Sequence, residues 1–189
     1  MLAGGRSRRF GRDKLAEEYQ GRPLLQHPVL RLLEVCDRVV VVLSPDAEEP
    51  PMPAGASVEF ARDALEDEGP LRGLSAGLEV ANAEWVVLAG GDMPDLQPPV
   101  LLEMLRAALE TGVVAVSLAD HGEERPLPCV LRSAPAAEAV GALLQAGRRS
   151  LRDLLAAVSA VVIDEPTWTA LDPERRTLID VDQPTDVDR

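Results

Sequence analysis

The chain has 189 residues, 46% of them hydrophobic and 27% charged, which is typical of a globular protein of about one domain. Its net charge of -13 and aromatic content of 3% exclude nucleic acid as an expected partner, since a phosphate backbone would be repelled and bases would find few rings to stack on. The sequence has no apolar run of about 18 residues and no signal-peptide pattern. We therefore expect one domain over residues 1–189, no membrane span and a cytoplasmic location.

A glycine-rich, basic segment opens the chain. Gly4, Gly5 and Gly11 let the backbone approach a ligand closely, and five of the first fourteen side chains are basic in an otherwise acidic protein. Lys14 is the only lysine in the chain, and a compact ammonium suits contact with a single phosphoryl oxygen. The spacing fits neither a Walker A loop nor a dinucleotide fingerprint. We therefore predict a polyphosphate site here, with chance placement of the lysine as the alternative.

The patterns that follow alternate between helix and strand, which is typical of an α/β fold. Only three residues precede Gly4, although a phosphate loop normally leaves the end of a strand, so we expect the true start of that strand to lie upstream of Met1. Amphipathic or capped stretches predict helices that begin near His27, at Pro70, at Pro98, at 136 and, after an N-cap at Ser150, at 151. Apolar runs predict strands at 39–44, 57–61, 113–118, 161–164 and 177–183, and one from 84 to Asp92. In the helix over 98–110 the expected inward side chains are Leu101, Leu102, Leu105 and Leu109.

Two motifs in the middle of the chain suggest ligand contacts. Gly69-Pro70 predicts a helix start, and helix N-termini accept acceptor-rich ligands, although Gly73 and Gly77 alternatively indicate a simple packing face. Asp92 ends a buried strand at the edge where open α/β sheets bind ligands. A carboxylate beside a triphosphate is a natural Mg²⁺ ligand, while the alternative is a turn aspartate that caps its own loop.

Four separated segments resemble the nucleotidyltransferases and, among them, the molybdenum cofactor guanylyltransferases of the MobA family. The segments are Leu-x-Gly-Gly-x-Ser-x-Arg-x-Gly-x-Asp-Lys at 2–14, Gly69-Pro70-Leu71, Asp92-Met93-Pro94 and Asp182-Gln183-Pro184. The resemblance implies a three-layer α/β, Rossmann-like nucleotide-diphospho-sugar transferase fold with a mainly parallel central sheet. It also implies transfer of GMP from GTP to molybdopterin or Mo-molybdopterin, with release of pyrophosphate. Other proteins of cofactor biosynthesis would be partners.

The same resemblance implies roles for individual residues. Lys14 would stabilise charge on the α-phosphoryl group, Arg9 would hold the leaving pyrophosphate, and Asp92 with Asp182 would bind Mg²⁺. Arg125 and Arg148 would lie on the side of the second substrate, although a strand-edge charge and a partner for a helix C-terminus are equally good interpretations of these two arginines. The residues expected at the nucleotide are Leu2, Ala3, Gly4, Gly5, Gly11, Lys14, Asp63, Gly69 and Asp92.

The C-terminal motif leaves the substrate open. Asp180 and Asp182 would face one side of a strand, but guanylyltransferases more often have Asn-x-Asn-x-Pro there. Asp-x-Asp-x-Pro is more common in related nucleotidyltransferases, so a molybdopterin cytidylyltransferase and a sugar- or polyol-phosphate nucleotidyltransferase are alternatives. A nucleotide-binding regulatory protein without catalysis is the alternative from another class.

Overall fold

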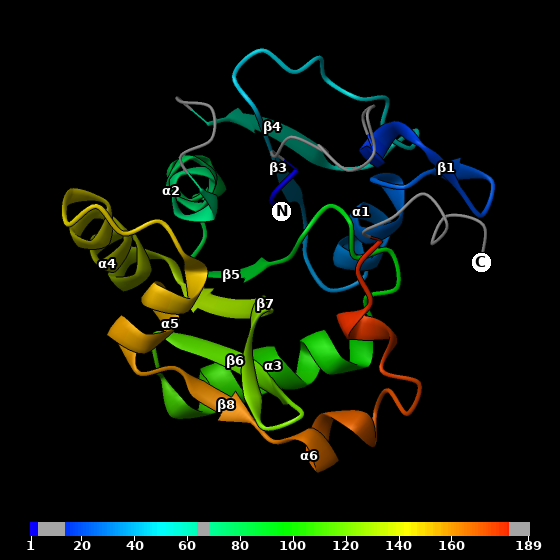
Figure 1. Cartoon of the computed structure of the whole chain (residues 1–189). Helices are drawn as coiled ribbons and strands as arrows, with labels where there is room; N and C mark the ends of the chain where they lie inside the picture. Colours follow the sequence, from blue (N-terminus) through cyan, green and yellow to red (C-terminus); the bar gives the residue numbers. More distant parts are fainter. Residues whose placement is uncertain (4–13, 64–68, 182–189) are drawn as a thin grey trace.

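The computed structural model describes residues 1–3, 14–63 and 69–181 (Figure 1). Its main strands are β3 (Val39–Leu43), β4 (Val58–Arg62), β5 (Trp85–Leu88), β6 (Ala115–Asp120), β7 (Glu123–Arg132) and β8 (Val161–Ile163). β3 pairs in parallel with β4, β6 pairs in parallel with β8, and β7 lies antiparallel between β5 and β6. A small separate hairpin is formed by β1 (Glu18–Tyr19) and β2 (Arg22–Pro23).

Leu2 joins the two halves of the sheet. It bridges in parallel to Val42, at the end of β3, and to Gly90, just beyond β5. The Leu2 N–H donates to the Ala89 carbonyl at 2.9 Å, and the Ala3 N–H donates to the Val42 carbonyl at 2.9 Å. Among the described strands of this sheet, β7 alone runs against the others, so the predicted mainly parallel sheet is confirmed.

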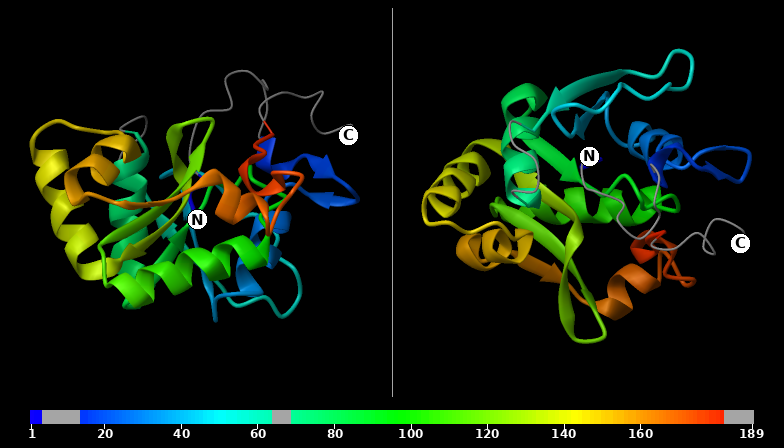
Figure 2. Two further views of the ribbon diagram at one scale, coloured as in Figure 1. Left: turned by 90° about the horizontal axis from the view of Figure 1, so that it is seen from below. Right: turned by 45° about the horizontal axis from the view of Figure 1, so that its top comes forward.

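Helices cover both faces of the sheet. They are α1 (Gln26–Leu33), α2 (Pro70–Ala81), α3 (Pro98–Thr111), α4 (Ser133–Gln145), α5 (Leu151–Val158) and α6 (Glu165–Thr169), with short 3₁₀ turns η1 (Lys14–Ala16) and η2 (Arg176–Leu178). One apolar cluster joins α1, α3 and Trp168 to the sheet, and a second joins α2, α4 and α5. On β7, Val130 belongs to the first cluster while Cys129 and Leu131 belong to the second, because successive side chains alternate between faces. Figure 2 shows the resulting three layers, as predicted.

Most predicted element starts are confirmed, and α3 corrects one predicted face. Pro70 is the first residue of α2, and the Ser150 side chain accepts the Arg152 N–H as the N-cap of α5. In α3, however, Leu102 and Leu109 are 53% and 64% exposed. The buried positions of this helix are Val100, Leu101, Met104 and Ala108. Residues four apart lie on the same side of a helix, so Val100, Met104 and Ala108 form the inward face. The leucines at 102 and 109 lie on the other side, although they are more hydrophobic than Ala108.

The predicted strand over 177–183 is wrong for its described part. Residues 176–178 form η2, and Ile179 to Val181 pair with no strand of the described chain. At Thr177 side chains occupy hydrogen bonds that a strand would make with its neighbour. The Asp172 carboxylate accepts the Thr177 N–H at 2.8 Å, and the Thr177 hydroxyl accepts the Gln97 N–H at 3.2 Å. Asp180 is exposed, and Asp182 lies outside the described residues.

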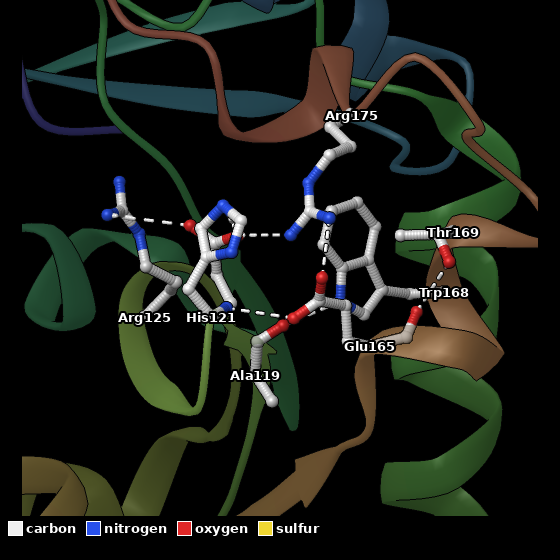
Figure 3. Close-up of polar contacts among 8 residues, drawn as sticks. Ala119, His121, Arg125, Glu165, Trp168, Thr169 and Arg175 are labelled. Atoms are coloured by element: carbon white, nitrogen blue, oxygen red, sulfur yellow. Dashed lines mark hydrogen bonds and ion pairs between the residues drawn. The ribbon is translucent and has the colours of Figure 1, made fainter.

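A polar cluster fixes the segment that leads to η2 against the β6–β7 hairpin (Figure 3). The buried Trp168 donates its ring N–H to the Ala119 carbonyl at 2.7 Å, and the Arg175 guanidinium lies 5.3 Å from the Trp168 ring. Arg175 also pairs with Asp120 and Glu165. Asp120, His121 and Glu165 offer ligand atoms within 4.8 Å of one another, but Arg175 already compensates both carboxylates, so we assign no metal site to them.

A cavity of about 530 Å³ lies between the facing edges of β3 and β5, next to the bridge that Leu2 makes. Its lining includes Val40, Val87 and the buried Met1. The Met1 amino group donates to the Val40 carbonyl at 2.7 Å, and burial lowers the pKa of this group to about 5. That the first strand starts upstream of Met1 stays a prediction. None of the described helices is both long and apolar enough to cross a membrane.

Candidate active site

Four of the predicted residues, Leu2, Lys14, Asp63 and Asp92, lie at the carboxyl edge of the parallel strands. Leu2 lies between β3 and the end of β5, Asp63 follows β4, and Asp92 follows β5. A methyl group built on Gly73 of α2 would lie 3.3 Å from Leu2 Cδ2 and 3.8 Å from Asp63 Oδ2, so these side chains meet over one face of the helix. This is the edge at which open α/β sheets bind ligands.

Lys14 and Asp92 form the charged centre of this edge. Lys14 Nζ lies 2.8 Å from Asp92 Oδ2 and donates to the Val181 carbonyl at 2.7 Å. The two side chains are 14% and 31% exposed, so the pair is mostly shielded from water yet open on one side. The Asp92 carbonyl in turn accepts the Val181 N–H at 2.9 Å. Three segments that are distant in the sequence are thereby joined around one ammonium.

The backbone before Asp92 is shaped to hold the carboxylate. A methyl group on Gly90 would lie 2.5 Å from Asp92 Oδ1, closer than any side chain could approach. The next residue, Gly91, donates its N–H to the Leu2 carbonyl at 2.8 Å. Only glycine at position 90 therefore lets the Asp92 side chain fold back against its own strand and leave Oδ2 toward Lys14.

A small apolar cluster holds Val181, one of the partners of Lys14. Tyr19, Leu24 and Val181 are buried together, with Leu15 packed against them. The Tyr19 hydroxyl donates to Asp95 Oδ2 at 3.2 Å, and burial, followed by the nearby Asp95 charge, raises the pKa of Tyr19. No sequence motif marks the Val181 carbonyl as a partner, because a backbone oxygen has no residue signature, and none marks Tyr19.

The start of α2 lies against the segment that carries Arg148 and Arg149. The Leu71 N–H donates to the Arg149 carbonyl at 3.3 Å. The Arg149 guanidinium donates to the Leu144 carbonyl at 3.1 Å and so pairs with the C-terminal end of α4. The Arg148 guanidinium pairs with Asp153 on α5.

The other predicted residues are placed as follows. Arg125 lies within β7, and one of its terminal nitrogens is 3.8 Å from Asp120 Oδ2, while its buried Nε has no hydrogen-bond partner. Ala3 and Lys14 border residues 4–13 at either end. Gly4, Gly5, Arg9, Gly11 and Asp182 lie outside the described residues.

Substitution of Gly69 by alanine should reduce the free energy of unfolding by about 3 kcal/mol. Gly69 has φ 82° and ψ 170°, a region that only glycine adopts readily, and an added methyl group would lie 3.0 Å from both Arg149 Cβ and its carbonyl oxygen. Gly112→Ala is the matched control, since its φ of 66° costs only about 1 kcal/mol and its methyl group meets nothing within 4 Å. Urea unfolding measures both, and equal losses would contradict the steric explanation.

Comparison with known proteins identifies the family. The family model of the MobA-like NTP transferase domain matches residues 1–161. The chain belongs to this family. It is 33% identical over 192 residues to a probable molybdenum cofactor guanylyltransferase of Natronomonas pharaonis, covering 100% of this chain and 94% of the relative. It is also 35% identical over 158 residues to the molybdenum cofactor guanylyltransferase of Pseudomonas entomophila, covering 82% and 80% of the two chains.

Solved structures that superpose on this chain support the same fold. The molybdopterin-guanine dinucleotide biosynthesis protein A of Archaeoglobus fulgidus superposes with a TM-score of 0.75 at 22% identity, covering 100% of this chain and 93% of that one. The 2-C-methyl-D-erythritol 4-phosphate cytidylyltransferase of Thermus thermophilus gives 0.69 at 19% identity, covering 98% and 93%. At these identities the likeness establishes the nucleotidyltransferase fold.

Proposed function

We propose that this chain is a molybdenum cofactor guanylyltransferase, which transfers GMP from GTP to molybdopterin or Mo-molybdopterin and releases pyrophosphate. The observation that carries the proposal is the Lys14–Asp92 pair, 2.8 Å apart, at the carboxyl edge of the sheet in a chain of the MobA-like family. The names of the relatives, which match this chain over nearly its whole length, support guanine as the base and molybdopterin as the acceptor.

The reaction depends on the positioning of the two phosphates more than on a strong base. A terminal phosphate oxygen of the acceptor forms a bond to the α-phosphorus of GTP, and the bond from that phosphorus to the bridging oxygen breaks, so that pyrophosphate leaves with the electron pair. The attacking oxygen is already anionic at neutral pH. The main barrier is the approach of two anions, which cationic groups and fixed geometry overcome.

Lys14 is the group on this chain best suited to the α-phosphoryl charge. Its ammonium lies at the open edge of the sheet, held by the Asp92 carboxylate and the Val181 carbonyl. Arg9 would hold the leaving pyrophosphate, with Gly4, Gly5 and Gly11 forming the loop around it. Leu2, Ala3, Asp63 and Gly69 would frame the nucleotide, and Arg125 and Arg148 would face the acceptor.

The oxygen atoms around Lys14 fit a divalent cation. A carboxylate oxygen and a carbonyl oxygen converge on the ammonium at 2.8 and 2.7 Å, and Mg²⁺ prefers such hard oxygen donors. Asp92 would hold Mg²⁺ here, with Asp182 as a further ligand. When bound, the metal would offset negative charge on the nucleotide phosphates. The enzyme would work in the cytoplasm beside proteins that make molybdopterin or accept the finished dinucleotide, without nucleic acid or membrane.

Titration calorimetry with GTP and CTP in the presence of Mg²⁺ tests the choice of base. We expect GTP to bind at least about ten-fold more tightly than CTP, a difference of about 1.4 kcal/mol. Pyrophosphate release should then require GTP, molybdopterin and Mg²⁺ together. Asp92→Asn should abolish this release, while Glu110→Gln on the exposed face of α3 should not change it.

Other outcomes of the binding and pyrophosphate measurements would contradict the proposal, each in a different way. Preference for CTP would make the chain a molybdopterin cytidylyltransferase. Release of pyrophosphate only with a sugar or polyol phosphate would change the acceptor. Tight GTP binding with no release in the presence of molybdopterin would make the chain a regulatory nucleotide-binding protein.

A further inference from the structure

Lys14 occupies the position at Asp92 that a divalent cation would take. Its Nζ lies 2.8 Å from Asp92 Oδ2 and 2.7 Å from the Val181 oxygen. An ammonium held by a carboxylate and a carbonyl oxygen is the protein's own substitute for a bound cation. The ammonium thereby neutralises the central carboxylate of the site.

The two oxygens of Asp92 are not equivalent for a metal. Oδ1 packs against Gly90, since a methyl group built there would lie 2.5 Å from this oxygen. Oδ2 is the oxygen that contacts Lys14. A cation approaching the open side of the carboxylate therefore meets the same oxygen that Lys14 holds, and two cations on one oxygen repel each other strongly.

We propose that Lys14 is the resting counter-ion of Asp92 and competes with the divalent cation for Oδ2, so that nucleotide phosphate must draw Lys14 away before the metal binds well. This inference rests on the proposed function for the identity of the phosphate ligand. The site would therefore bind its two ligands in order. The metal alone binds weakly, because Lys14 holds Oδ2. The nucleotide draws Lys14 away and adds phosphate oxygens as ligands for the metal. By linkage, loss of the competitor should raise metal affinity without nucleotide.

Mn²⁺ binding in the absence of nucleotide tests the competition, with the free ion measured by electron paramagnetic resonance. Lys14→Met keeps an unbranched side chain, one atom shorter, and removes its charge, so the Kd for Mn²⁺ should fall by about ten-fold or more. Arg106→Met is the matched control, because it removes one positive charge from the exposed face of α3 and should leave the Kd unchanged. Asp92→Asn should abolish the binding that Lys14→Met strengthens.

An unchanged or weaker Mn²⁺ affinity in Lys14→Met would overturn the proposal, as would equal tightening in Arg106→Met or Mn²⁺ binding that survives Asp92→Asn. The wild-type chain gives a second test that does not depend on a folded variant. Because Lys14 is the only lysine, protein labelled with ¹⁵N-lysine has one Nζ signal. Mg²⁺ alone, at concentrations that fill the Mn²⁺ site, should shift this signal, and an unmoved signal would refute the competition.

The results for this proposal and for the function are separable. A chain that shows the Mn²⁺ effect of Lys14→Met but transfers no GMP would refute the proposed function alone. A chain that transfers GMP but shows no change in Mn²⁺ affinity would refute the competition alone.

Discussion

Lys14→Met should lower kcat for GMP transfer by about 10²- to 10³-fold, which corresponds to a loss of about 3–4 kcal/mol of transition-state stabilisation. The ammonium lies at the carboxyl edge of the sheet and is the group best placed to meet charge that develops on the α-phosphoryl oxygens. Measurement of pyrophosphate release at saturating GTP and molybdopterin gives kcat. Arg106→Met, with the same change in net charge, should keep kcat within about two-fold of wild type.

The cause of the loss can be separated from loss of the metal. If Lys14 competes with the cation, Lys14→Met binds Mn²⁺ more tightly while turning over more slowly, so raising the Mg²⁺ concentration should not restore kcat. Asp92→Asn should instead lose metal affinity and turnover together. Recovery of Lys14→Met at high Mg²⁺, or a kcat near that of wild type, would contradict a direct role of the ammonium in the transition state.

Local chemistry explains which elements the sequence predicted correctly. The start of α2 at Pro70 and the cap of α5 at Ser150 depend on residues within one turn of the helix, and both are confirmed. The strand expected up to Asp92 forms as the shorter β5 (Trp85–Leu88), and Asp92 lies in the turn that follows it. In each case the deciding residues are neighbours in the chain.

The wrong predictions depend on contacts made with residues outside the predicted element. The expected strand after Thr177 does not form there, because Asp172 binds the Thr177 N–H while the Thr177 hydroxyl binds the N–H of Gln97 on another segment. The inward face of α3 is the one that packs on the sheet, and it carries Val100, Met104 and Ala108 while Leu102 and Leu109 lie outside it. The Val181 carbonyl as a partner of Lys14 could not be predicted, since any residue at this position offers the same oxygen. The roles of the predicted site residues stay predictions.

The stability of a chain whose amino terminus is Met1 should fall by up to about 4 kcal/mol as the pH is lowered from 8 to 5. Burial lowers the pKa of the Met1 amino group from 8.0 to about 5. In this window the unfolded chain binds a proton that the folded chain does not, so the free energy of unfolding rises with pH. The stabilisation is fully present above pH 8 and is lost as the pH falls through 5.

Urea unfolding at intervals between pH 8.5 and pH 5.5 measures this slope. A chain extended before Met1 by four apolar residues is the control, because its amide nitrogen at Met1 carries no titratable proton and can still donate to the Val40 carbonyl. The extended chain should lose the part of the slope that Met1 causes, while the slope from all other groups persists in both chains. Equal slopes in the two chains would mean that the Met1 ammonium reaches water in the folded protein. In that case the edge of the sheet beside Leu2 opens in solution, and the cavity between β3 and β5 admits water at the amino terminus.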